Sequence, residues 1–348
     1  MFGLLPQEIM KAAVFVEKGK PLELRDVAVP QPGPGQIRVR VKACGVCGSD
    51  LHASEADWTP RDIIMGHEFA GFVDATGPGV TRWLPGDRVV PLAQISCGRC
   101  PACLADNSSA CENLELTDYN PASGGAYAEF TIVGELDAIA MPEGLDFDEA
   151  AAIEPLAVGL DAARRARITA ADSILVIGAG PIGLTVTQWA RFFGARDIVV
   201  AELNPARLEV ARRLGATAAI EVTQDTDIAT AFEELTGRKP SLIFEAVGAP
   251  GMIQRCIDMA KRDSRIVIVG VCQQADSFEP KDCILKALQL IFAYGYTNDD
   301  YAYIVELLGA RRILAAPLIS HRVSLQELPA EFEALRNPTD QIKVIVRP

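Results

Sequence analysis

The spacing of apolar and polar residues changes near residue 155 of the chain. Before this point, short apolar runs are separated by Pro and Gly, and residues 37–41 alternate between apolar and polar side chains. Such alternation is typical of a half-buried strand, and several short strands at close spacing predict an antiparallel, barrel-like sheet. Residues 297–348 return to this pattern and end in an apolar, strand-like segment.

Between these two parts, apolar runs rich in β-branched residues alternate with segments of helical period. Continuous apolar strands between amphipathic helices predict a doubly wound parallel sheet, so the expected fold class is α/β. The predicted strands are 173–178, 197–202, 241–248 and 265–270, and the predicted helices are 181–193, 205–214, 228–235 and 250–261.

Composition narrows the class of protein. The 348 residues suffice for two or three domains, and 49% apolar with 23% charged residues is ordinary for a globular chain. The net charge of −13 makes a nucleic-acid partner unexpected, because phosphate binding needs basic surface. No apolar run reaches the roughly 18–20 residues that span a bilayer. The first ten residues lack a signal-peptide pattern, so we expect a cytoplasmic protein without a membrane partner.

A glycine-rich segment follows the first strand of the parallel sheet. It fits G-x-G-x-x-G, closes a predicted strand and opens a predicted helix, which is the context that a dinucleotide site requires. The helix N-terminus there offers free N–H groups to a pyrophosphate. The candidate cofactor-binding residues in this segment are Gly178, Gly180, Pro181, Ile182 and Gly183.

The choice of dinucleotide depends on the end of the next strand. Glu202 lies 19 residues after Gly183, where a carboxylate can accept hydrogen bonds from the ribose hydroxyls and would repel a 2′-phosphate. This favours NAD over NADP. Arg207 is a candidate to lie along the ribose, with a surface position as the alternative.

The chain has nine cysteines, which is an odd number, and it is far too long for a small disulfide scaffold. Four of them fall within fifteen residues, and short spacings of four soft ligands predict a closed, structural zinc site. An iron–sulfur cluster and two disulfides are the alternatives, the latter disfavoured in a reducing compartment. These ligands are Cys97, Cys100, Cys103 and Cys111.

A second set of metal-binding side chains is spread along the chain. Cys47 lies in CGVCGSDLH, His67 and Glu68 lie in MGHEFAG, and Glu154 lies in IEPLAVG. One Cys, one His and one or two carboxylates suit an open zinc site with room for water or substrate. These residues are spread over 108 positions, so their spacing alone does not show that they form one metal site.

The sequence resembles the zinc-dependent medium-chain dehydrogenases, the superfamily of alcohol and polyol dehydrogenases. The motifs CGVCGSDLH, GHE, the four-cysteine lobe, EPLAVG and VIGAGPIGL stand in the family's order. The resemblance implies a GroES-like β-barrel catalytic domain, residues 1–156 and 297–348, with the structural zinc lobe at 97–111. It also implies an inserted NAD-binding Rossmann domain at 157–296, and assembly as a homodimer or homotetramer.

The resemblance further implies a catalytic zinc on Cys47 and His67, with Glu68 or Glu154 completing the ligands. Glu154 stands where classical alcohol dehydrogenases carry a third-ligand Cys, as in the polyol, threonine and butanediol branch. The implied mechanism lowers the pKa of the substrate hydroxyl at zinc, relays its proton through Ser49 and His52, and moves hydride to the nicotinamide.

Other residues take implied roles from the same resemblance. Asp50 would accept a hydrogen bond from the far nitrogen of His67. Lys343 matches a basic residue near the pyrophosphate. Residues matching the nicotinamide site and the substrate cleft are, respectively, Val247, Val269 and Val271, and Trp58, Ala93, Tyr127 and Tyr294.

The expected activity is oxidation of a secondary alcohol, bulky or cyclic ones included, to a ketone with NAD as acceptor. A polyol or vicinal diol is the alternative substrate, although Ala293 replaces an Arg that polyol enzymes often use. A non-catalytic zinc- and nucleotide-binding protein is a further alternative. Cysteines outside the metal sites, expected to be inert core thiols, are Cys44, Cys256, Cys272 and Cys283.

Overall fold

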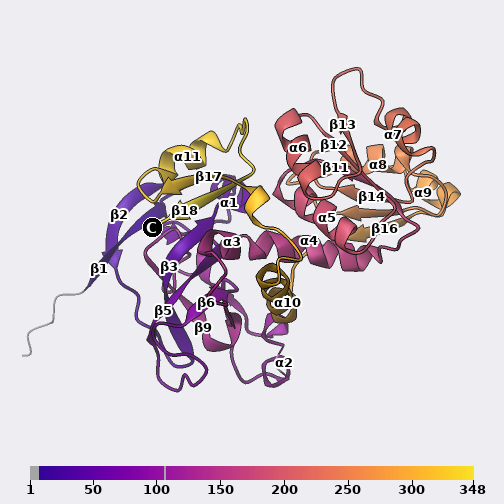
Figure 1. Ribbon diagram of the computed structural model, residues 1–348. Helices are drawn as coiled ribbons and strands as arrows, with labels where there is room; N and C mark the ends of the chain where they lie inside the picture. The colour runs from indigo at the N-terminus through magenta and orange to yellow at the C-terminus, as the bar shows by residue number, and fades with distance from the viewer. Residues whose placement is uncertain (1–7, 106) are drawn as a thin grey trace, which may run out of the picture. The chain divides into compact units, whose positions relative to one another are not determined.

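The computed structural model describes residues 8–105 and 107–348, which form two compact units (Figure 1). Unit 1 comprises the chain up to Glu154 together with Thr297–Pro348, and unit 2 is Pro155–Tyr296. The first boundary lies two residues before the predicted one because helix α4 (Ile153–Ala166) runs through it. The predicted domain 1–156 and lobe 97–111 include residues 1–7 and 106, which lie outside the described residues.

Unit 1 is built on mostly antiparallel strands. Its largest sheet has the order β10-β6-β5-β3-β18-β17, with β9 also paired to β3, and only the β17–β18 pair among them is parallel. A three-stranded sheet (β2-β1-β4) and a two-stranded one (β7-β8) complete the described strands of the unit. The bounds are β1 Ile9–Phe15, β2 Glu23–Ala28, β3 Gln36–Gly45, β4 Ile63–Ile64, β5 Glu68–Thr76, β6 Arg88–Pro91, β7 Gln94–Ile95, β8 Glu115–Leu116, β9 Phe130–Gly134, β10 Ala138–Ala140, β17 Ile319–Ser324 and β18 Lys343–Arg347.

Strand β3 shows why the alternating pattern folds in this way. Its apolar residues Ile37, Val39 and Val41 are buried in the core of unit 1, while the intervening polar residues lie closer to solvent. The neighbouring strand β5 approaches closely, since a Cβ on Gly71 would stand 2.1 Å from the carbonyl oxygen of Arg40. A glycine is therefore required where the two strands meet.

The helices of unit 1 are short and lie in its connections. The sequence predicts that residues 297–348 return to the pattern of short apolar runs, but this part begins with α10, which has a capping box formed by Thr297 and Asp300. The helices are α1 Gly48–Glu55, α2 Pro101–Leu104, α3 Phe147–Ala151, α10 Asn298–Gly309 and α11 Leu328–Ala334, with short 3-10 turns η1 Ser108–Ala110, η2 Thr117–Tyr119, η3 Glu135–Asp137 and η4 Ala316–Leu318.

Unit 2 contains a six-stranded, fully parallel sheet in the order β13-β12-β11-β14-β15-β16. Numbered within the unit, this order is 3-2-1-4-5-6, which is that of a Rossmann fold. The strands are β11 Ser173–Ile177, β12 Asp197–Glu202, β13 Ala218–Glu221, β14 Leu242–Glu245, β15 Arg265–Ile268 and β16 Gln289–Phe292, and the helices α5 Pro181–Phe192, α6 Pro205–Arg213, α7 Ile228–Thr236, α8 Met252–Met259 and α9 Pro280–Lys286.

The four predicted strands of this sheet correspond to its four central strands. The two outer strands, β13 and β16, were not predicted because they are short and only partly apolar.

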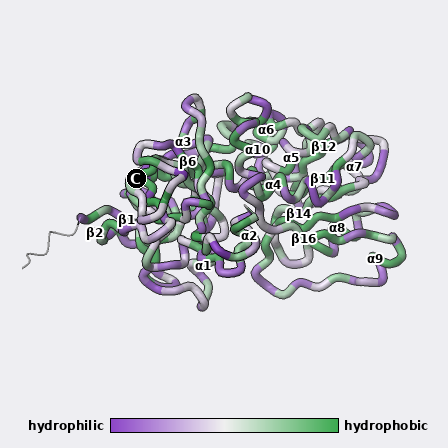
Figure 2. Tube along the Cα trace, turned by 90° about the horizontal axis from the view of Figure 1, so that it is seen from below, coloured by the Kyte–Doolittle hydropathy of each residue, from purple (hydrophilic) through white to green (hydrophobic). Residues whose placement is uncertain are grey.

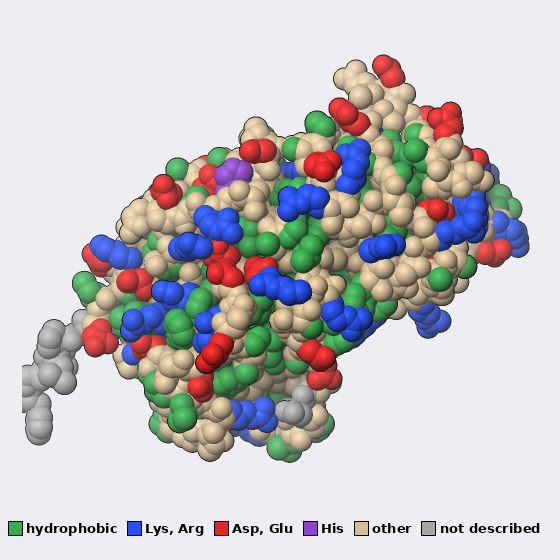
Figure 3. Space-filling model, in the orientation of Figure 1, with side chains coloured by type: hydrophobic (Ala, Val, Ile, Leu, Met, Phe, Trp, Pro, Cys, Tyr) green, Lys and Arg blue, Asp and Glu red, His purple; other side chains and the backbone are tan. Residues whose placement is uncertain are grey.

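Each unit has its own apolar core, and hydrophobic stretches appear along the chain in both (Figure 2). On the face drawn in Figure 3, acidic and basic side chains are interspersed rather than separated by sign. Among the described helices, none is long and apolar enough to traverse a bilayer.

Asp172 ties three segments of unit 2 together at the start of β11. One carboxylate oxygen accepts hydrogen bonds from the N–H of Thr169 at 2.8 Å and from its hydroxyl at 3.0 Å. The other accepts from Ser241 at 2.8 Å and from the guanidinium of Arg265. Burial raises the pKa of Asp172, but these hydrogen bonds outweigh it and the pKa lies below its usual value.

We predict that Asp172→Asn lowers the free energy of unfolding of unit 2 by about 1–3 kcal/mol at pH 7, because Arg265 loses its charged partner. A lowered carboxyl pKa stabilises the fold above the unfolded-state pKa of about 3.9, and this stabilisation is lost as pH falls through the folded-state pKa. Denaturant unfolding at pH 7 and near pH 3 measures the difference, with the exposed Asp225→Asn as control. Equal destabilisation at both pH values would contradict the assignment.

Candidate active site

The antiparallel register of β3 and β5 brings the distant metal-binding motifs together. Gly45 at the end of β3 lies opposite Glu68 at the start of β5. Two residues beyond Gly45, Cys47 forms the N-cap of α1 and its sulfur accepts the N–H of Ser49 at 3.5 Å. His67 immediately precedes β5. Two segments separated along the chain therefore meet at one end of a strand pair.

The ligand atoms of Cys47, His67 and Glu68 lie within 4.8 Å of one another. Glu68 is 1% exposed, and its buried Oε2 atom has no hydrogen-bond partner among the described residues. An unsatisfied buried carboxylate oxygen is costly unless a cation or donor meets it. One thiolate, one imidazole and one carboxylate form a donor set that zinc accepts. The residues present therefore fit a zinc ion.

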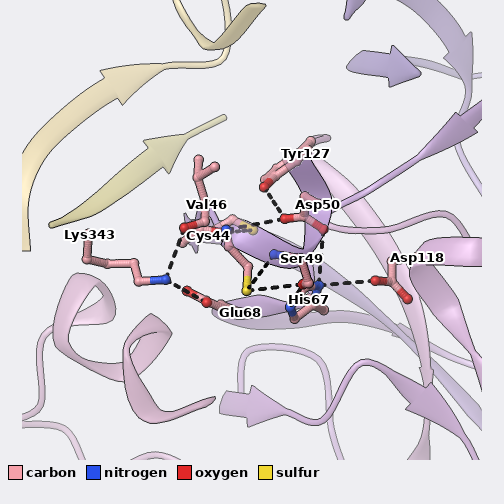
Figure 4. Close-up of polar contacts among 11 residues, drawn as sticks. Cys44, Val46, Ser49, Asp50, His67, Glu68, Asp118, Tyr127 and Lys343 are labelled. Atoms are coloured by element: carbon pink, nitrogen blue, oxygen red, sulfur yellow. Dashed lines mark hydrogen bonds and ion pairs between the residues drawn. The ribbon is translucent and has the colours of Figure 1, made fainter. Parts of the chain in front are cut away.

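Lys343 on β18 holds the other oxygen of Glu68 (Figure 4). Its Nζ donates to Glu68 Oε1 at 2.6 Å and to the carbonyl oxygen of Val46 at 3.0 Å. Burial would lower the pKa of Lys343, but the charge of Glu68 outweighs it, and the pKa is raised. In unit 1, Lys343 is thus an ion-pair partner of Glu68, and its position near a pyrophosphate stays a prediction.

Glu154 does not join the three-residue cluster. It lies in the first turn of α4, buried at 8% exposure, and its charge contributes to the raised pKa of Lys343. Its carboxylate therefore lies in the same charged environment as Glu68. The role of Glu154 as a zinc ligand stays a prediction.

The far nitrogen of His67 faces two carboxylates. Nδ1 lies 3.1 Å from Asp118 Oδ2 and 3.3 Å from Asp50 Oδ1. Burial would lower the pKa of His67, but the charge of Asp50 and the hydrogen bond to Asp118 outweigh it, and the pKa lies well above its usual value. Asp50 was expected here. Asp118 was missed because TDY, the local sequence, matches no motif.

Ser49 and His52, the expected proton relay, both lie on α1. The Ser49 hydroxyl lies 3.1 Å from Cys47 Sγ and 3.4 Å from His67 Nε2, so it stands at the proposed metal site. His52 is three residues further along the helix, on the same face, and is exposed. The hydrogen bonds found in the described part of the chain do not join the two side chains, so the relay stays a prediction.

The four cysteines of the lobe lie together as their spacing suggested. Their ligand atoms are within 4.8 Å of one another, and none of the described cysteines is in a disulfide. Cys100 and Cys103 have sulfurs 3.5 Å apart, close to the ~3.8 Å edge of a tetrahedron with zinc–sulfur bonds of about 2.3 Å. Backbone N–H groups of Arg99 and Cys100 lower the pKa of Cys97 to about 6, which favours the ligating thiolate.

The glycine-rich segment of unit 2 has the geometry of a dinucleotide turn. Gly178 has φ +95°, a left-handed conformation that favours glycine. A Cβ on Gly183 would stand 1.9 Å from the carbonyl oxygen of Gly178, so helix α5 packs against the turn only with glycine there. A Cβ on Gly180 would meet nothing within 4 Å, which leaves open space at the N-terminus of α5. Pro181 and Ile182 form the first turn of that helix.

Glu202 ends β12 beside this turn. One carboxylate oxygen accepts the N–H of Ala179 at 2.7 Å, and the other accepts those of Leu203 and Asn204 at 2.8 and 3.0 Å. The carboxylate therefore lies next to the glycine turn, where a ribose would need it. Arg207 is half-buried in the first turn of α6, and its ribose contact stays a prediction.

Glu245 organises the loops that carry the predicted nicotinamide contacts, and sequence reasoning did not identify it. Its Oε1 atom accepts the N–H groups of Val247 and Gly248 at 2.8 and 2.9 Å. Its backbone carbonyl accepts those of Val269 and Gly270 at 2.9 Å. Val247 is half-exposed, and Val271 is also exposed. One buried residue thus fixes both loops.

Several expectations need correction. Tyr127 cannot line a substrate cleft, because it is fully buried and its hydroxyl donates to Asp50 at 2.5 Å. Cys44 and Cys256 are buried as expected, whereas Cys272 and Cys283 are only half-buried. Cys283 still packs against the core of unit 2. Ala93 is also buried, whereas Trp58 in unit 1 and Tyr294 in unit 2 are exposed.

Comparisons with known proteins agree with this geometry. Residues 33–143 match the alcohol dehydrogenase GroES-like domain, and residues 181–310 match the zinc-binding dehydrogenase family. The chain is 30% identical to sorbitol dehydrogenase of Bacillus subtilis, with 100% of this chain and 99% of the relative covered. It is 31% identical to (R,R)-butanediol dehydrogenase of the same organism, with 97% of this chain and 100% of the relative covered.

Two solved structures share the whole fold. A putative zinc-binding dehydrogenase from Sinorhizobium meliloti, bound to NADP, has a TM-score of 0.86 at 30% identity and covers 98% of this chain and 100% of its own. An Escherichia coli protein described as a short chain alcohol dehydrogenase, complexed with NADH, has a TM-score of 0.86 at 28% identity and covers 98% and 99%. With the two metal-binding clusters and the glycine turn in place, this chain belongs to the zinc-dependent medium-chain dehydrogenases.

Proposed function

We propose that the protein oxidises a secondary alcohol to a ketone with NAD as hydride acceptor, and that it holds two zinc ions, one catalytic and one structural. The convergence of Cys47, His67 and Glu68 around a buried carboxylate oxygen without a partner carries this proposal. The relatives named for sorbitol and (R,R)-butanediol favour a substrate with neighbouring hydroxyl groups, beside the bulky or cyclic alcohols that the sequence suggested.

The chain's own residues divide the work at the catalytic site. Cys47, His67 and Glu68 would hold the catalytic zinc, and the buried Glu154 is the alternative carboxylate ligand. When bound, zinc acts as a Lewis acid that lowers the pKa of an alcohol. The Ser49 hydroxyl, beside His67 and Cys47, would accept the alcohol proton while giving up its own toward His52. The exposed His52 would then release a proton to solvent.

The cofactor would be held by unit 2. The open space at Gly180 and the N-terminus of α5 suit a pyrophosphate, and Glu202 suits the ribose hydroxyls. NAD supplies the hydride acceptor when bound. The negative charge of Glu202 supports NAD rather than NADP for this chain. Of the two solved structures, one is bound to NADP and the other to NADH.

Replacing the proposed thiolate ligand tests the catalytic zinc. We predict that Cys47→Ser reduces kcat at least about 100-fold and removes about one of two zinc ions per chain, because a hydroxyl is a poorer zinc ligand than a thiolate. Metal analysis and NADH absorbance measure the two effects. Cys283→Ser, at a half-buried thiol outside both metal clusters, is the matched control. Undiminished turnover in Cys47→Ser would refute the catalytic site.

The prediction of NAD rather than NADP depends on the negative charge of Glu202. We expect Glu202→Gln to raise the ratio of kcat/KM for NADP to that for NAD by about 10–100-fold, because the 2′-phosphate no longer meets a negative charge. The amide oxygen of Gln can still accept the N–H groups of Leu203 and Asn204, and only the contact with the N–H of Ala179 is lost. Glu209→Ala, at an exposed carboxylate of α6, should leave the ratio unchanged. An unchanged ratio in Glu202→Gln would remove Glu202 from cofactor selection.

A substrate panel tests the reaction class. We expect kcat/KM to be highest for vicinal diols and other secondary alcohols and lower for primary alcohols, measured as NADH formation by zinc-replete protein. The absence of turnover with primary, secondary, cyclic and polyhydric alcohols alike would instead support a non-catalytic zinc- and nucleotide-binding protein.

A further inference from the structure

Two carboxylates face the Nδ1 atom of His67, but their contacts differ in kind. Asp118 Oδ2 lies at 3.1 Å in hydrogen-bonding geometry. Asp50 Oδ1 lies at 3.3 Å and has no hydrogen-bond partner among the described residues. Figure 4 shows Asp118 on the side of His67 away from Lys343 and Glu68. Asp118 therefore makes the shorter contact with Nδ1, and Asp50 Oδ1 faces the same nitrogen.

The second oxygen of Asp50 has partners of its own. Its Oδ2 atom accepts the Tyr127 hydroxyl at 2.5 Å and the N–H of Cys47 at 3.3 Å. These contacts close the N-terminus of α1 and anchor a core tyrosine. The Oδ2 atom of Asp50 thus serves the helix and the core, while its Oδ1 atom faces the imidazole together with Asp118.

The turn that carries Asp118 is held in place on several sides. The N–H of Thr117 donates to the carbonyl oxygen of Ala93 at 3.1 Å, and the Ser123 hydroxyl donates to the carbonyl oxygen of Thr117 at 3.2 Å. Tyr119 packs against Trp58, with ring centroids 5.6 Å apart. Asp118 itself is only 4% exposed. Its carboxylate is therefore presented to His67 by a rigid turn.

The two ring nitrogens of His67 have separate surroundings. Nδ1 faces Asp118, whereas Nε2 lies 3.4 Å from the Ser49 hydroxyl, on the side of Cys47. A hydrogen bond on one nitrogen fixes the tautomer, and a carboxylate acceptor makes the other nitrogen a better metal ligand. Such outer partners change metal affinity by about 10–100-fold when removed.

We propose that Asp118 is a further positioning residue of the catalytic metal site, which shares the Nδ1 proton of His67 with Asp50 and so helps to present an unprotonated Nε2 to the zinc. This inference rests on the proposed function. It adds a residue of the TDY turn to the role that the family resemblance implied for Asp50 alone.

Zinc affinity tests the proposal without depending on turnover. We expect Asp118→Ala to weaken binding of the catalytic zinc about 10–100-fold, and Asp118→Asn to weaken it less, because the amide oxygen accepts the proton without a negative charge. Competition with a chromophoric zinc chelator gives the affinity, and Co²⁺ in place of zinc reports the ligand field through its visible spectrum. Glu115→Ala, at an exposed carboxylate of the same segment that contacts Asn120, is the matched control.

The outcomes distinguish a failure of this inference from a failure of the proposed function. Retention of the four-cysteine zinc and an unchanged circular dichroism spectrum identify folded variants. If Asp118→Ala does not fold, Asp118→Asn carries the test, with at least a threefold loss expected. Wild-type zinc affinity in a folded Asp118 variant overturns the inference while leaving the proposed function intact. If the wild-type protein and Cys47→Ser have the same zinc content, the proposed function itself is overturned.

Discussion

The alignment of three neighbouring strands at one end of a sheet brings the residues of the proposed catalytic site together. Gly45 on β3 lies opposite Glu68 on β5 and opposite Ile345 on β18. This register places Cys47, Glu68 and Lys343 beside one another, although Lys343 is 275 positions from Glu68. Because side chains alternate between the faces of a sheet, a slip of one residue would turn Glu68 away from the cluster. The metal site therefore depends on strand pairing over the full length of unit 1.

In unit 2, the order of the parallel strands brings the residues of the proposed cofactor site to one edge of the sheet. The glycine turn follows β11, Glu202 ends β12 and Glu245 ends β14, so all three lie at the carboxyl edge of the sheet. Strand order reverses beside β11, where ligands of such sheets bind. Glu202 then contacts the glycine turn through Ala179, and Glu245 fixes the two loops on the other side.

A functional site can be predicted from the sequence when its residues lie close together along the chain. The glycine turn and the four-cysteine lobe were predictable because each is a short segment whose chemistry fixes its residue types. The central strands of the parallel sheet were predictable from their continuous apolar runs. Asp118 and Glu245 were not, because each acts through a contact that only the folded chain creates. Tyr127 was misplaced for the same reason, since its aromatic character suits a cleft as well as a core.

The charge balance of the site explains why these distant contacts matter. Asp50, Glu68, Asp118 and Glu154 are all less than 9% exposed, and Lys343 contacts one of them. Burial of several carboxylates is unfavourable unless positive charge accompanies them. Burial would lower the pKa of His67, but the charge of Asp50 and the hydrogen bond to Asp118 raise it. A divalent cation held by Cys47, His67 and Glu68 would bring positive charge to these carboxylates. The buried carboxylates, which are unfavourable by themselves, would thus favour metal binding.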